Sequence, residues 1–153
     1  MFAAKSHQQK GGTMTSTLRR ATAVAAAMLL AAGAGLATAA TVHVRLTGAQ
    51  EAPPVKTMAH GAGVIEVAAD RAVSGKISTS GVKATMAHIH EAAPGKNGPP
   101  IVMLKRGPKG TWVVPAGSRL SPREYKAFLA GDLYVNVHSA AHPGGEIRGQ
   151  IKP

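Results

Sequence analysis

The chain has 153 residues, and its 18 Lys and Arg outnumber its 7 Asp and Glu, which gives a formal net charge of +11 at pH 7. It contains no cysteine, so disulfides, thiolate nucleophiles and cysteine-ligated metal sites are excluded. The positive charge favours anionic partners, but only 3% of the residues are aromatic and the basic residues are scattered, so nucleic-acid binding is not expected.

The N-terminal segment has the pattern of a secretory signal peptide. Two arginines precede an uncharged, alanine-rich run over residues 21–40, and this run contains the small-x-small sequence Ala37-Thr38-Ala39. A membrane anchor is the alternative, because about twenty apolar residues can span a bilayer. We predict a signal peptide over residues 1–39, with Met14 as an alternative start. The remaining domain, residues 40–153, would then be periplasmic or secreted, without a transmembrane segment.

The chain after residue 40 is predicted to form mainly short strands. Alternation of apolar and polar residues with a period of two is typical of strands with one solvated face. Such stretches occupy residues 41–47, 61–69, 73–80, 86–91, 101–105 and 110–114. Between them, residues 94–100 contain three prolines and two glycines and predict a loop.

One helix is predicted, over residues 121–130. Ser121 and Glu124 have the spacing of a capping box, Pro122 suits the first helical position, and Gly131 suits the left-handed residue after the helix. An apolar stripe of Tyr125, Phe128 and Leu129 would face the core.

A hairpin is predicted over residues 133–151. Apolar residues alternate with polar ones on both sides of the turn signal Pro143-Gly144-Gly145. We therefore expect two half-buried strands whose polar faces carry His138, Glu146, Arg148 and Gln150. Seven or eight short strands with frequent turns predict an all-β, antiparallel sandwich.

Three stretches resemble the CHRD, or chordin-type, domain family. They are LTGAQEAPPV (residues 46–55), AHIHEAAPGKNGPPIVML (87–104) and AGDLYVNVHSAAHPGGEIRGQI (130–151), and they occur in the family's order. The resemblance covers residues 41–152. It implies an extracellular, immunoglobulin-like Greek-key β-sandwich that is not an enzyme. Morphogen binding, for which the animal members are named, is not carried over to this chain.

Two histidines depart from the pattern of the family that the chain resembles. His142 stands where asparagine or an aromatic residue is more usual, and His60 stands where a small polar residue is usual. Family membership alone therefore does not explain them.

The most specific local feature is His88-Ile89-His90. Residues two apart on a strand face the same way, about 6.6 Å apart at Cα, so both imidazoles can converge on one metal ion. A sandwich can bring His138 beside them, with water or His142 in a fourth position, which predicts a copper or zinc site. Glu91 is a candidate outer acceptor for an imidazole N–H.

Two alternatives remain open for this cluster. The histidines can instead be hydrogen-bonded members of a polar structural cluster. Met86 shares the strand face of the histidine pair, and its soft thioether would favour copper(I), although simple packing also accounts for a methionine there.

A second constellation consists of Glu51, Glu146 and Arg148. We predict that Arg148 is largely buried in an ion pair that ties the segment around Glu51 to the last strand. The alternative is an anionic-ligand site on Arg148.

No catalytic arrangement is found in the sequence. Ser139 follows His138, but neighbours on a strand point to opposite faces and cannot act as nucleophile and base. The sequence therefore predicts an exported, non-catalytic binding module for copper or zinc. The competing hypothesis is an adhesion or envelope module that binds an extracellular protein or an anionic polymer, with structural histidines.

Overall fold

The computed structural model describes residues 39–153, so the predicted signal peptide, except for its last residue, lies outside the described residues. In this part of the chain no helix is long and apolar enough to cross a membrane. The elements in chain order are β1 (Ala40–Thr47), the 3-10 turn η1 (Gly48–Gln50), β2 (His60–Val67), β3 (Val73–Ser80), β4 (Ala84–Glu91), β5 (Pro100–Met103), β6 (Lys105–Arg106), β7 (Thr111–Val113), α1 (Pro122–Ala130), β8 (Leu133–Ser139) and β9 (Ile147–Ile151).

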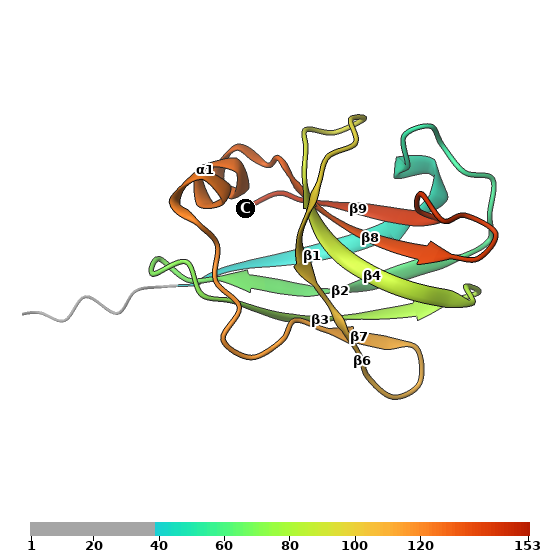
Figure 1. Cartoon of the computed structure of the whole chain (residues 1–153), viewed down its shortest axis with the longest axis horizontal. Coiled ribbons are helices and arrows are strands. Elements are labelled where there is room, and N and C mark those ends of the chain that lie inside the picture. The colour runs from blue at the N-terminus through green and yellow to red at the C-terminus, as the bar shows by residue number, and fades with distance from the viewer. Residues whose placement is uncertain (1–38) are drawn as a thin grey trace, which may run out of the picture. The chain divides into compact units, whose positions relative to one another are not determined.

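The strands form an all-β, antiparallel sheet in the order β5-β4-β8-β9-β1-β2-β3-β7-β6. The two ends of this order, β5 and β6, are separated in sequence only by Leu104, so the sheet curls until it nearly closes like a barrel (Figure 1). The prediction of an antiparallel all-β fold is confirmed. The immunoglobulin-like sandwich that the resemblance implies is not confirmed. A sandwich has two sheets, whereas here the pairing connects all nine strands into a single sheet.

The core lies on the concave side of this sheet, and β1 shows why the sequence folds this way. Val42, Val44 and Leu46 are buried, whereas His43 and Arg45 between them are exposed. Each such aliphatic side chain stabilises the fold by about 1.5–3 kcal/mol through its burial. The same alternation continues in β4 and β8, whose apolar positions are also buried in this core.

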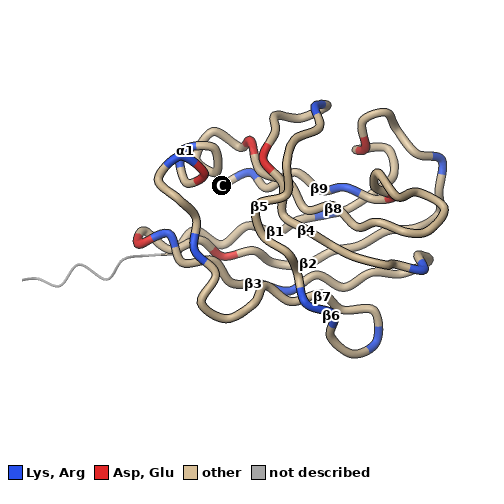
Figure 2. Tube along the Cα trace, in the orientation of Figure 1, with Lys and Arg blue, Asp and Glu red and all other residues tan. Residues whose placement is uncertain are grey.

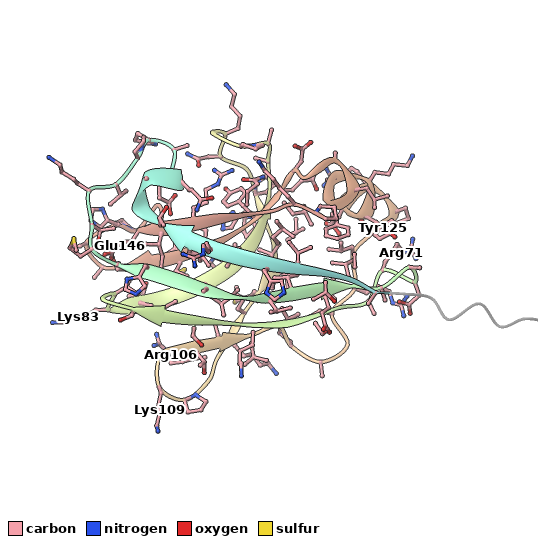
Figure 3. The ribbon with its side chains drawn as sticks, turned by 180° about the vertical axis from the view of Figure 1, so that it is seen from behind. Arg71, Lys83, Arg106, Lys109, Tyr125 and Glu146 are labelled. Atoms are coloured by element: carbon pink, nitrogen blue, oxygen red, sulfur yellow. The ribbon has the colours of Figure 1, made fainter. Side chains whose placement is uncertain are left out.

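The helix prediction is confirmed at both ends. The Ser121 side chain accepts a hydrogen bond from the Glu124 backbone N–H, the Glu124 carboxylate accepts one from Ser121, and Gly131 is left-handed with φ 78°. The predicted apolar stripe is only partly right, because Phe128 is fully buried but Leu129 is 58% exposed. In Figure 3, Tyr125 of this helix and Glu146 lie at opposite ends of the sheet.

The outer face of β8 differs from the prediction of a half-buried strand. All seven residues of β8 are buried, including the polar Asn136 and His138. Two long loops, which we call the first loop (residues 48–59) and the second loop (residues 92–99), stand on the same side of β8 and β9 in Figure 1. Their backbone and side chains bond to the polar residues of these strands, so this face forms a second, polar interior.

Candidate metal centre

Three of the predicted histidines lie together on the outer face of β4 and β8. His88 of β4 is opposite Asn136 of β8. His90 is opposite Tyr134, and His138 is two residues beyond Asn136. The aliphatic residues between these positions face the core, so alternation turns all three imidazoles to the outer face.

The rings are close enough to act as one group. His88, His90 and His138 are only 6–8% exposed, and one nitrogen atom from each ring lies within 4.8 Å of the others. Ring centroids of His88 and His138 are 4.9 Å apart. Ligands of one tetrahedral metal ion with bonds of about 2.0–2.1 Å lie about 3.4 Å apart, so the gathered nitrogens exceed that spacing by no more than about 1.4 Å.

Backbone carbonyls fix the tautomers of two of the rings. His138 Nδ1 donates to the Pro143 carbonyl at 3.0 Å, and His90 Nδ1 donates to the Gly98 carbonyl at 2.9 Å. Both rings therefore present a lone pair on Nε2. The Nε2 atom of His138 accepts a hydrogen bond of 3.1 Å from Nδ1–H of His88, whereas Nε2 of His90 has no partner. Such carbonyl partners are the usual means by which proteins orient metal-ligating imidazoles.

The electrostatic environment keeps these imidazoles neutral. Burial lowers the pKa of His88, and the neighbouring His138 and His90 lower it further. Burial is also the main cause that lowers the pKa of His90 and of His138, although their carbonyl partners oppose it. A neutral imidazole is the form that binds metal ions, because a proton and a metal ion compete for the same lone pair. The donor set therefore fits copper or zinc.

The structure does not bring two other predicted residues to this centre. His142 is not among the residues whose ligand atoms gather there, and its backbone N–H instead donates to the Ser139 hydroxyl at 3.2 Å. Glu91 follows His90 on β4 and so projects to the opposite face. Its carboxylate pairs with Arg123 of α1. It is therefore not an outer acceptor for the imidazoles.

Arg148 is buried as predicted, at 1% exposure, but its partners differ from the prediction. Its guanidinium donates to the carbonyls of Lys96 at 2.6 Å and Ala93 at 3.1 Å, both in the second loop. It also donates to the Gln150 side chain at 2.9 Å. The ion pairs found in residues 39–153 involve other arginines, and Glu146 instead accepts from the Thr57 hydroxyl at 2.8 Å. Arg148 therefore fixes the second loop rather than the first.

Glu51 of the first loop is buried without a direct ion pair. It is 6% exposed, its Oε1 has no hydrogen-bond partner, and its Oε2 accepts a long bond of 3.4 Å from Asn136. Burial raises its pKa to about 7, against the opposing effects of the Arg148 charge and of the Asn136 hydrogen bond. Glu51 and Arg148 thus interact only through space.

Tyr134 connects the histidines to Arg148, a role that was not predicted from the sequence. Its ring stacks on His90 with a centroid separation of 5.0 Å and an angle of 15°. The Arg148 guanidinium lies on the Tyr134 ring at 3.5 Å. The period-two pattern of β8 already placed Tyr134 and His138 on one face, and this was the available signal. The carbonyls of Gly98 and Pro143 leave no signal in the sequence.

The fold and this centre together define an all-β module with a buried three-histidine cluster beneath two loops. Residues 42–151 match the family model of the CHRD domain, so the chain belongs to the CHRD domain family. No curated protein and no solved structure gives a significant match.

Proposed function

We propose that this protein is an exported, non-catalytic CHRD module that binds one transition metal ion, copper or zinc, through His88, His90 and His138. Membership of a family of typically extracellular, non-enzymatic modules supports export and the absence of catalysis. The signal-peptide pattern of residues 1–39 supports export as well.

The observation that carries the proposal is the convergence of one nitrogen from each of three buried imidazoles, one of which has no hydrogen-bond partner. Nε2 of His90 is buried and has no hydrogen-bond partner. A buried polar atom without a partner costs about 1–3 kcal/mol, so a purely structural cluster would be expected to pair it. A metal ion held by three imidazoles satisfies that atom and uses the tautomers that the carbonyls of Gly98 and Pro143 already impose.

The test is calorimetric titration of the protein with copper(II) and with zinc(II). We expect one ion per chain, and thermal unfolding shifted upward by several degrees, because metal at a hundred times its Kd adds about 2.7 kcal/mol to the stability. The variants His90→Gln and His138→Gln should each weaken binding by at least about tenfold. His43→Gln, at an exposed position of β1, is the matched control and should bind like the parent. The absence of both binding heat and a shift in Tm at stoichiometric metal would contradict the proposal.

A second candidate function rests on a groove between the two loops. This groove, of about 830 Å³, is lined by residues of both loops, with three basic side chains, Arg45, Lys96 and Lys152, against one carboxyl group, that of Glu51. Elsewhere the basic residues are spread over several loops and strands (Figure 2). Three cations around one concave surface favour an anionic ligand, and an envelope polymer that carries carboxylates suits such a groove.

This second candidate has its own test. Binding of a soluble polyuronate to the protein should weaken with salt, and the double variant Lys96→Gln/Lys152→Gln should lose most of it. Lys83→Gln/Lys109→Gln removes the same charge outside the groove lining and is the matched control. Equal loss in both double variants would assign the binding to net charge alone and contradict a groove site.

A further inference from the structure

Two methionines at the surface adjoin the three-histidine cluster. Met86 of β4 is 47% exposed and Met103 of β5 is 69% exposed. Methionine normally fills gaps in a core, where its flexible side chain is useful. Neither residue is in the hydrophobic core of this fold, so packing does not account for them.

The strand register places both thioethers beside the histidines. Met86 is directly opposite His138 in the β4–β8 pairing, and Met103 is directly opposite His88 in the β4–β5 pairing. Directly opposed residues project to the same face with Cβ atoms about 4.5–5.5 Å apart. The side chains of Met86 and Met103 therefore rise from the same outer face as the imidazoles, and each can reach a ring of the cluster.

The charges around the cluster favour a monovalent ion. All three gathered ligand residues are neutral histidines, and no carboxylate within residues 39–153 is among them. The charged side chain that acts on His90 is the guanidinium of Arg148, which stacks on Tyr134 behind it. A divalent ion in such surroundings would keep its full charge without a counter-ion, whereas a monovalent ion carries half of it.

From the thioethers and from this charge we propose that the metal of the centre is copper in its cuprous state, with the thioether of Met86 or of Met103 as the fourth ligand at the exposed side of the cluster. This rests on the proposed function, since it assigns the ion of that same site. Thioethers are soft ligands that suit copper(I), whereas zinc is bound by imidazole, thiolate and carboxylate. The two methionines therefore favour copper(I) over zinc, whereas three histidines alone can bind either metal.

The experiment measures the copper(I) affinity of the protein under anaerobic conditions with ascorbate, by competition against a chromophoric copper(I) chelator. The double variant Met86→Leu/Met103→Leu keeps side-chain size and removes both sulfur atoms. We expect its copper(I) affinity to fall by at least about tenfold, with zinc(II) affinity unchanged. Met58→Leu is the control, because Met58 is 92% exposed and lies in the first loop.

A second readout identifies the ligands directly. X-ray absorption at the copper edge should show sulfur scattering in the parent protein and nitrogen scattering alone in the double variant. Copper(I) affinity unchanged in the double variant, or no sulfur scattering in the parent, would overturn this inference and leave a three-histidine site intact. No copper(I) bound by the parent overturns it too, and calorimetry with zinc(II) then shows whether the three-histidine site has also failed.

Discussion

Replacement of Glu51 by glutamine tests the electrostatics of the polar interior. The Glu51 carboxyl is buried beside Asn136, and each of the two side chains has an oxygen atom without a partner. When Glu51 is ionised, the two unpaired atoms, Glu51 Oε1 and Asn136 Oδ1, can only accept hydrogen bonds, so neither can pair with the other. The amide introduced by Glu51→Gln is neutral at every pH and has an N–H that can donate to Asn136 Oδ1.

The magnitude follows from the pKa of Glu51, which is raised from 4.5 to about 7. Each pH unit corresponds to 1.36 kcal/mol, so the full effect is about 3 kcal/mol, and screening by nearby solvent reduces it to about 1–3 kcal/mol. Because the folded state holds this proton more tightly than the unfolded state, the penalty is absent below pH 4.5. It develops as the pH rises from 4.5 and is complete above about pH 7.

The assay is urea denaturation of the parent and of Glu51→Gln at several pH values between 5 and 8.5. We expect the variant to be more stable by about 1–3 kcal/mol at pH 8.5, and the two curves to converge towards pH 5. The three clustered histidines titrate in both proteins, so their contribution cancels in the difference. Glu66→Gln, which alters an exposed carboxylate of β2, is the control. A stability difference that does not change with pH would refute the reasoning.

Three further predictions concern stability and are measured by urea or thermal unfolding. Arg148→Ala should cost at least about 3 kcal/mol, because it removes charged hydrogen bonds to two carbonyls and the contact with Tyr134. Arg148→Lys should recover only part of this, and full recovery would contradict a role for the planar guanidinium. Gly145→Ala should cost about 1–3 kcal/mol, because φ is +131° and a Cβ would lie 2.5 Å from the Asn136 side chain. Gly144→Ala, which would meet no atom within 4 Å, should stay within about 0.5 kcal/mol, and equal losses would contradict the steric argument. Ser121→Ala should cost about 1 kcal/mol through loss of the helix cap, and no loss would show that packing alone holds the helix.

Local patterns in the sequence were sufficient to predict most of the strands and the helix. Residues 73–80 form β3 with the predicted bounds, and the capping box at Ser121 begins the helix. These features depend on neighbours in sequence, which the period-two pattern and capping rules describe. Leu129 was wrongly assigned to the buried stripe, because the face of the helix that packs on the core carries Tyr125, Ala127 and Phe128 instead.

The polar interior is formed by contacts between segments that are distant in the sequence, so local patterns predicted it less completely. The sequence predicted that His88, His90 and His138 share a face, and the structure places them together. It predicted that the segment around Glu51 joins the last strand, but not that the second loop covers the same face, because hydrogen bonds such as Arg148 to the Lys96 carbonyl join residues 52 positions apart. Nor did it assign Arg148 the correct partners, since backbone carbonyls have no residue type from which to infer them.

The continuity of β5 and β6 has a consequence for how copies of this protein can meet. One stretch of chain, residues 100–106, supplies the last strand at either end of the ladder: its first part pairs with β4 and its second part with β7. Long unpaired strand edges are where extended chains join and grow into fibrils, and here neither margin is more than four residues long. Neither β5 nor β6 therefore offers a second copy a long backbone edge on which to add a strand, and fibril growth through these two margins is disfavoured.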